Sequence, residues 1–68
     1  MDMKLQINGE ARELEEPMTI AQLIEHLKLD GRQVAVERNR ELVRKTDFGD
    51  IELLDGDELE IVTFVGGG

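Results

Sequence analysis

The group in this sequence that is best suited to chemistry is a main-chain carboxylate, the one on Gly68 that follows Gly66 and Gly67. A carboxylate is a poor electrophile, so its use requires activation, for instance as an acyl-adenylate formed with ATP and Mg²⁺. A sulfur or nitrogen nucleophile can then displace the nucleotide. Three extended residues reach about 10 Å, and glycines leave no Cβ to obstruct a narrow channel. We therefore expect Gly66 and Gly67 to enter a partner's active site and Gly68 to be the modified residue.

The side chains argue against an enzyme. Serine, cysteine, tyrosine and tryptophan are absent, so the usual hydroxyl and thiol nucleophiles reduce to three threonines. His26 is the only histidine, and it must be weighed because histidine is the side chain used most often as a general base. A helix over residues 20–28 would bury an apolar stripe and place His26 on the opposite, solvated side. We expect neither a catalytic side chain nor a bound metal or cofactor.

Length and charge restrict the classes of protein further. A chain of 68 residues, 40% apolar and 35% charged, fits a single globular domain. Its net charge of −8 disfavours nucleic acid and anionic membrane surfaces and favours a protein partner with a basic face. The residues from Met1 to Leu5 lack the basic start and apolar run of a signal peptide. We therefore expect a cytoplasmic protein.

The first strands are indicated by a hairpin signal. Leu5 and Ile7 alternate with polar residues and are followed by Asn8-Gly9, in which both residues tolerate positive φ. A return strand is predicted over residues 11–14, ending before Pro17 because proline cannot donate to a β-ladder.

A helix is predicted next. Thr19 is suited to be its N-cap, Gln22 can complete a capping box, and Met18 is placed to pack against Leu23. Gly31 is expected to take the left-handed position after the end of the helix. A short, one-sided helix of this kind must lie on a sheet.

The second half of the chain predicts another hairpin and a closing strand. Val34 and Val36 lie on one face of the first of these strands, and Asn39-Arg40 turns the chain into a brief strand through Leu42 and Val43. Residues 44–57 are expected to be irregular, and the closing strand to run from Glu58 to Val65. The apolar anchors of the irregular segment are expected to be Phe48, Ile51, Leu53 and Leu54.

The order strand, strand, helix, strand, short strand, strand predicts an α+β fold. It is the β-grasp arrangement of ubiquitin, a mixed sheet of four to five strands with one main helix on one face. By analogy with that fold, the first and last strands should be parallel neighbours. We expect residues 1–65 to form the single domain and residues 66–68 a flexible glycine tail.

A resemblance that covers nearly the whole chain is carried by four segments in order, and those segments are Asn8-Gly9-Glu10, Thr19-Ile20-Ala21-Gln22-Leu23-Ile24, Val34-Ala35-Val36-Glu37-Arg38-Asn39 and Asp55-Gly56-Asp57-Glu58-Leu59-Glu60-Ile61-Val62 ahead of the glycines. In these segments the chain resembles the ThiS family of sulfur carriers in thiamine biosynthesis. Two positions depart from that family's pattern: Arg40 stands where glycine is expected, and Arg44 where proline is expected.

The resemblance implies a mechanism and partners. A ThiF-like enzyme would adenylate Gly68 with ATP and Mg²⁺, a sulfur donor protein would convert it to a thiocarboxylate, and a ThiG-like thiazole synthase would take the sulfur. Three alternatives stay open: a MoaD-like carrier for molybdopterin synthesis, a modifier joined to protein lysines, and a β-grasp binding module whose glycines are inert.

A docking surface is expected beside the tail, because ordering three glycines costs about 3–6 kcal/mol that contacts of the folded body must offset. We expect an apolar patch formed by Val62, Phe64 and Val65, framed by the acidic Glu58 and Glu60. Half of the basic residues gather in a short segment, and these four could contact an anion or a partner or form the solvated face of a hairpin: Arg38, Arg40, Arg44 and Lys45.

Overall fold

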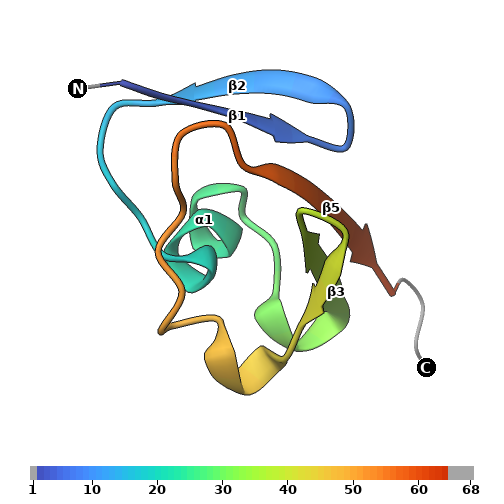
Figure 1. Cartoon of the computed structure of the whole chain (residues 1–68). Helices are drawn as coiled ribbons and strands as arrows, with labels where there is room; N and C mark the ends of the chain where they lie inside the picture. Colours follow the sequence, from blue (N-terminus) through green and yellow to red (C-terminus); the bar gives the residue numbers. More distant parts are fainter. Residues whose placement is uncertain (1, 65–68) are drawn as a thin grey trace.

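The computed structural model describes residues 2–64, whose strands form one mixed sheet in the order β2-β1-β5-β3-β4 (Figure 1). The strands are β1 (Met3–Ile7), β2 (Glu10–Leu14), β3 (Val34–Arg38), β4 (Glu41–Val43) and β5 (Glu58–Thr63). The α-helix of this region is α1 (Ile20–His26), and the short 3₁₀ turns are η1 (Gly31–Gln33) and η2 (Lys45–Asp47). The β-grasp arrangement expected from the sequence is confirmed.

Both hairpins turn through residues with positive φ. Asn8 and Gly9 have φ of 52° and 82°, and Asn39 and Arg40 have φ of 52° and 72°. Two positive φ values in succession match the right-handed twist of the flanking strands, which is why such turns connect hairpins. The left-handed conformation costs a residue with a Cβ about 1–2 kcal/mol, which explains why glycine is the expected residue at the position of Arg40.

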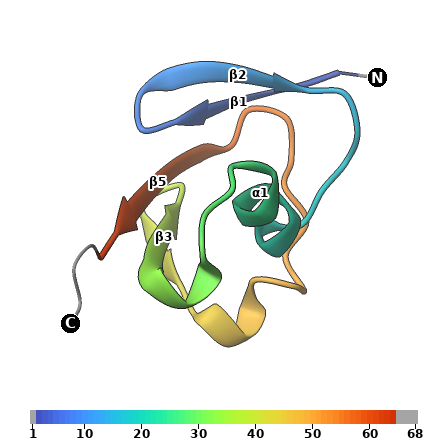
Figure 2. The ribbon, with the colours of Figure 1, turned by 180° about the vertical axis from the view of Figure 1, so that it is seen from behind.

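Strand β5 lies at the centre of the sheet. It pairs in parallel with β1 through Gln6 opposite Glu58 and Ile7 opposite Leu59, as predicted, and antiparallel with the whole of β3. The two parallel strands run in one direction, so β1 begins and β5 ends on opposite sides of the molecule (Figures 1 and 2). Strand β5 ends at Thr63, so the predicted strand is too long at Phe64, and its last predicted residue, Val65, lies outside the described residues.

The start of α1 has the predicted capping box. Thr19 Oγ1 accepts from the Gln22 backbone N–H at 3.1 Å, and Gln22 Oε1 accepts from the Thr19 N–H at 2.9 Å. The first two helical N–H groups, those of Ile20 and Ala21, donate to carbonyls in the segment between β4 and β5. Because these N–H groups have no partner within a helix, they hold that irregular segment against the helix end. None of the helices in residues 2–64 is long and apolar enough to cross a membrane.

The end of α1 differs from the prediction. The helix stops two residues early, and the left-handed position is taken by Lys28, with φ of 61°, and not by Gly31, which opens η1. The Leu29 N–H donates to the Ile24 carbonyl at 3.0 Å, the bond that defines a Schellman ending. Because this bond closes the last turn around Lys28, the helix ends there. Gly31, three residues further along the chain, is not required to end it.

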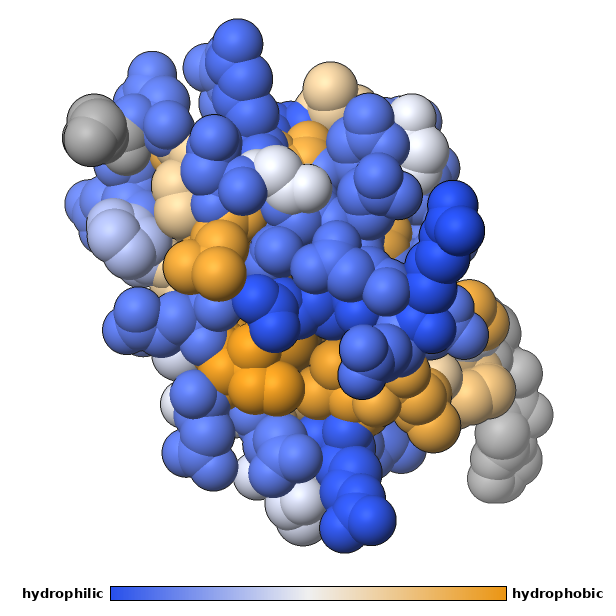
Figure 3. Space-filling model, viewed as in Figure 1, coloured by the Kyte–Doolittle hydropathy of each residue, from blue (hydrophilic) through white to orange (hydrophobic). Residues whose placement is uncertain are grey.

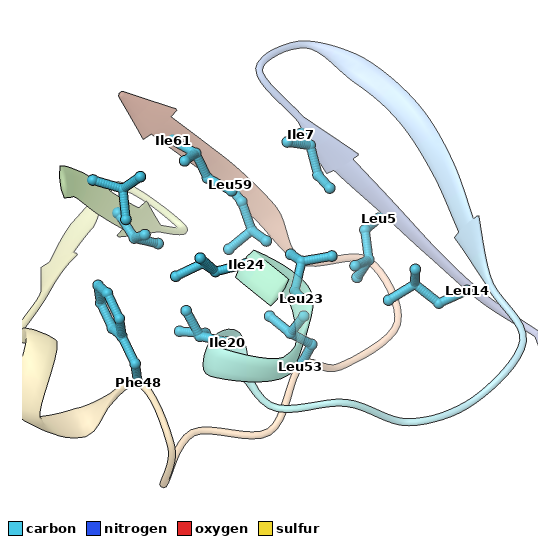
Figure 4. Close-up of a cluster of buried hydrophobic side chains, with 12 residues drawn as sticks. Leu5, Ile7, Leu14, Ile20, Leu23, Ile24, Phe48, Leu53, Leu59 and Ile61 are labelled. Atoms are coloured by element: carbon cyan, nitrogen blue, oxygen red, sulfur yellow. The ribbon is translucent and has the colours of Figure 1, made fainter. Parts of the chain in front are cut away.

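The core fills the space between α1 and the sheet face that it covers (Figure 4). Its buried members are Leu5, Ile7, Leu14, Ile20, Leu23, Ile24, Val34, Val36, Phe48, Leu53, Leu59 and Ile61. One predicted anchor is wrong: Leu54 is 58% exposed, whereas the neighbouring Leu53 is buried. The Leu53 N–H donates to the Met18 carbonyl next to the start of α1, whereas Leu54 opens a turn in which its N–H donates to the Asp57 carboxylate and its carbonyl accepts from the Asp57 N–H.

Candidate functional site

The predicted docking residues lie on the sheet face opposite α1, here called the outer face. Leu59 and Ile61 of β5 are buried toward the helix, so the alternate residues of the strand face outward. Val62 and Phe64 are each 54% exposed, and Phe64 is absent from the core cluster. Val65, the third predicted apolar residue, lies outside the described residues.

A further apolar residue was not anticipated. Leu42, on β4, is 72% exposed and stands opposite Glu37 in the β3–β4 register, which places it on the outer face with Val62. On the side of the molecule seen in Figure 3, apolar side chains form a band that extends toward the end of β5, with hydrophilic side chains along both edges. Leu42 is assigned to the outer face by the pairing of β4 with β3. The alternation of residues within one strand does not show which face that strand shares with another.

The acidic residues of the outer face lie next to one another. Glu60 is directly opposite Glu37 on β3, and both are exposed, as is Glu58. Like charges opposite each other in a sheet destabilise it, so this pair does not contribute to folding. Together the carboxylates give this part of the outer face a negative potential, which suits a basic partner surface.

Two turn asparagines hold β5 from both sides, a feature that the sequence did not reveal. Asn8 Oδ1 accepts from the Ile61 N–H at 2.8 Å, and Asn8 Nδ2 donates to the Ile61 carbonyl at 3.1 Å. On the other edge, Asn39 Oδ1 accepts from the Glu58 N–H at 3.0 Å, and the Asn39 N–H donates to the Glu58 carbonyl at 2.7 Å. The strand that leads to the glycine tail is therefore fixed in register by side chains as well as by its neighbours.

The predicted basic cluster is divided by the fold. Arg38 Nε is 2.9 Å from Oδ2 of the buried Asp57, whose carboxylate also accepts from Asn39 Nδ2 and the Leu54 N–H. Burial alone would raise the pKa of the Asp57 carboxyl, but these hydrogen bonds and the arginine charge outweigh it and hold that pKa below its usual range. Arg38 thus has a structural partner, while Arg40, Arg44 and Lys45 are exposed.

The predicted tail residues Gly66, Gly67 and Gly68 lie outside the described residues, and their roles stay predictions. His26 is exposed, as expected for a solvated histidine. Within residues 2–64, no three histidine or acidic side chains lie close enough together to hold a metal ion. The described residues therefore include an outer face with exposed apolar and acidic side chains, and β5, the strand that precedes the tail, contributes to this face.

Comparisons with known proteins fit this geometry. The model of the ThiS family matches residues 5–68. The sulfur carrier protein ThiS of Bacillus subtilis (strain 168) is 42% identical over 65 residues, which are 94% of this chain and 98% of that protein. A crystal structure of the thiamine biosynthesis protein (ThiS) from Geobacter metallireducens superposes with a TM-score of 0.83 at 32% identity, covering 97% of this chain and 100% of the other.

A longer protein also contains a similar segment. A thiazole synthase of Paramagnetospirillum magneticum (strain ATCC 700264 / AMB-1) is 52% identical over 66 residues, which are 97% of this chain. The chain spans about a fifth of that protein, since the match covers 20% of its length. The family match across residues 5–68, the ThiS relative that is matched almost end to end and the shared fold lead to one conclusion: this chain belongs to the ThiS family.

Proposed function

We propose that this chain is a sulfur carrier of thiamine biosynthesis and that its working group is the α-carboxylate of Gly68. A ThiF-like enzyme transfers AMP from ATP to this carboxylate and releases pyrophosphate, with Mg²⁺ bound by that enzyme and not by the carrier. Sulfur at the oxidation level of sulfide, supplied by a donor protein, then attacks the acyl carbon of Gly68, so that a C–S bond forms while the C–O bond to AMP breaks and AMP leaves. The observation that carries the proposal is the family match, which extends through Gly68.

The acceptor that we propose is a ThiG-like thiazole synthase. Proteins named thiazole synthase in Paramagnetospirillum magneticum and Magnetococcus marinus contain a segment 52% and 38% identical to this chain, which supports a functional link between carrier and synthase. The carrier acts as a substrate in these steps and contributes no catalytic side chain. We place it in the cytoplasm, where ATP is available to the activating enzyme.

Docking would use the outer face. Val62 and Phe64 supply exposed apolar area, and Glu58 and Glu60 supply charge, along β5 and the residue that follows it. Contacts here offset the entropy lost when the tail is ordered in a channel. Leu42 extends this surface from β4 and belongs to the proposal.

The decisive experiment is ATP–pyrophosphate exchange with a ThiF-like enzyme from the same organism, followed by intact-mass measurement after a sulfur donor is supplied. Deleting Gly67 and Gly68 shortens the reach by about 7 Å and should abolish exchange, and adding one alanine after Gly68 should do the same. The melting temperature should change little, because these residues follow the last strand.

A mass gain equal to the exchange of one oxygen for sulfur is the expected result for the intact protein. If the truncated protein is still adenylated, or the intact protein never gains sulfur, the proposal is wrong. Lysine conjugates in place of a thiocarboxylate would indicate a protein modifier, and sulfur transfer to a molybdopterin precursor and not to thiazole would indicate a MoaD-like carrier.

A further inference from the structure

Lys45 is fixed beside the last described residue of the outer face. Its Nζ lies 3.2 Å from the Arg32 carbonyl, to which it donates, and 6.0 Å from the centre of the Phe64 ring. Phe64 is itself held, because its N–H donates to the Gln33 carbonyl at 2.7 Å. A positive charge is therefore positioned next to the apolar side chain from which the tail continues.

This charge has no carboxylate partner among residues 2–64. The ion pairs of that region are Arg32–Asp30 and Arg38–Asp57, although acidic residues outnumber basic ones by 16 to 8 in the whole chain. The Lys45 ammonium has three N–H donors and uses one of them on the Arg32 carbonyl. The other two N–H donors of Lys45 can therefore bind an acceptor on another molecule, and the hydrogen bond to Arg32 already restrains the side chain.

A second lysine lies close by. Lys28 lines a surface hollow together with Thr63 and Phe64, and it takes part in no ion pair among residues 2–64. Asp30 lines the same hollow, but its carboxylate is already bound by the Arg32 guanidinium at 3.0 Å. We call Lys28 and Lys45 the basic collar, because Lys28 shares a hollow with Phe64 beside the end of α1 and Lys45 Nζ lies over the Phe64 ring.

The charge on the surface around β5 therefore changes sign along the strand. Its beginning and middle carry Glu58 and Glu60, the latter opposite Glu37, whereas its end is adjacent to the basic collar. A partner surface of uniform sign would attract one part and repel the other. Complementary charge patterns of this kind select the orientation in which two proteins dock.

We propose that the surface of the activating partner that receives this carrier bears carboxylates opposite Lys28 and Lys45, and is basic only farther from the tail, opposite Glu37 and Glu60. This inference rests on the proposed carrier function and adds a feature of the partner to it. The acidic groups would lie at the mouth of the channel that takes the tail, where they fix the approach angle of the carrier.

The test compares two charge reversals that change the net charge equally. Lys45→Glu alters the basic collar, and Lys4→Glu is the matched control, because the Lys4 carbonyl accepts from the Gly56 N–H and so lies beside the start of β5. Equilibrium binding to the purified ThiF-like enzyme is measured with the full chain. Lys45→Glu should raise Kd about tenfold and Lys4→Glu should not raise it, while Lys45→Arg should bind like the wild type.

The outcomes separate this inference from the proposed function. If the wild type is adenylated and Lys45→Glu binds equally well or more tightly, the partner surface is uniformly basic. This inference is then wrong, whereas the proposed carrier function stands. Equal weakening by Lys45→Glu and Lys4→Glu would show an effect of net charge and would also overturn it. If the wild type is not adenylated, both proposals fall. Should Lys45→Glu fail to fold, Lys45→Met keeps the stem over the ring, and its binding must still be weaker than that of the wild type.

Discussion

At the scale of single residues, substitution of Phe64 tests the proposed docking surface. Its ring is half-exposed and lies outside the core, so Phe64→Ala should leave the melting temperature nearly unchanged. Truncating a central interface aromatic costs about 2 kcal/mol of binding free energy, so Kd for the activating enzyme should rise about thirtyfold. Isothermal titration calorimetry measures the affinity and a thermal melt the stability.

Leu54→Ala is the control for this prediction. Leu54 is 58% exposed, similar to Phe64, but it precedes β5 and lies at the opposite end of that strand from the tail. The control should leave affinity unchanged. A loss of stability in Phe64→Ala with unaltered affinity would instead place the ring in a structural role.

At the scale of elements, the buried Asp57 joins the beginning of β5 to the end of β3 and the turn that follows it. Its carboxyl pKa is lowered in the folded state, so its contribution to stability is complete above the unfolded pKa of about 4 and is lost as pH falls through the folded value. Asp57→Asn should lower the unfolding free energy at pH 7 by about 2 kcal/mol, because Arg38 loses a charged acceptor.

The same substitution should flatten the dependence of stability on pH below about pH 4, where the wild-type carboxyl takes up its proton. Urea unfolding at several pH values measures both effects. Asp50→Asn, at an exposed carboxylate, is the control and should keep the wild-type slope. An Asp57→Asn profile parallel to that of the wild type down to pH 2 would contradict the assignment.

For the whole molecule, the net charge of −8 predicts how association depends on salt. Attraction to a largely basic partner surface raises the association rate constant. Dissolved salt screens this attraction over a distance of about 8 Å at physiological ionic strength. The association rate constant should therefore fall as salt rises from 50 to about 300 mM, whereas the dissociation rate constant changes less. Stopped-flow binding measures both constants. An association rate that does not respond to ionic strength would exclude electrostatic steering.

The sequence by itself determined the order of the elements and the likeness of the chain to one family. Hairpin turns and the capping box are local signals, because the φ preferences of Asn8-Gly9 and the bonds between Thr19 and Gln22 involve residues close in the chain. Alternation along β5 is equally local, since burial of Leu59 and Ile61 toward the helix directs the residue between Ile61 and Thr63, Val62, outward. The end of the helix was predicted less well, because Lys28 accepts a left-handed conformation that its residue type disfavours.

Only the tertiary structure decided which distant residues meet. Leu42 joins the outer face through strand register, Asn8 binds Ile61 across 53 positions, and Lys45 Nζ lies 6.0 Å from the centre of the Phe64 ring. Such contacts depend on the sheet order β2-β1-β5-β3-β4, which no local preference encodes. The buried Asp57 makes the same point: a carboxylate among many others in an acidic sequence becomes a structural group only where Arg38 and Asn39 are brought to it.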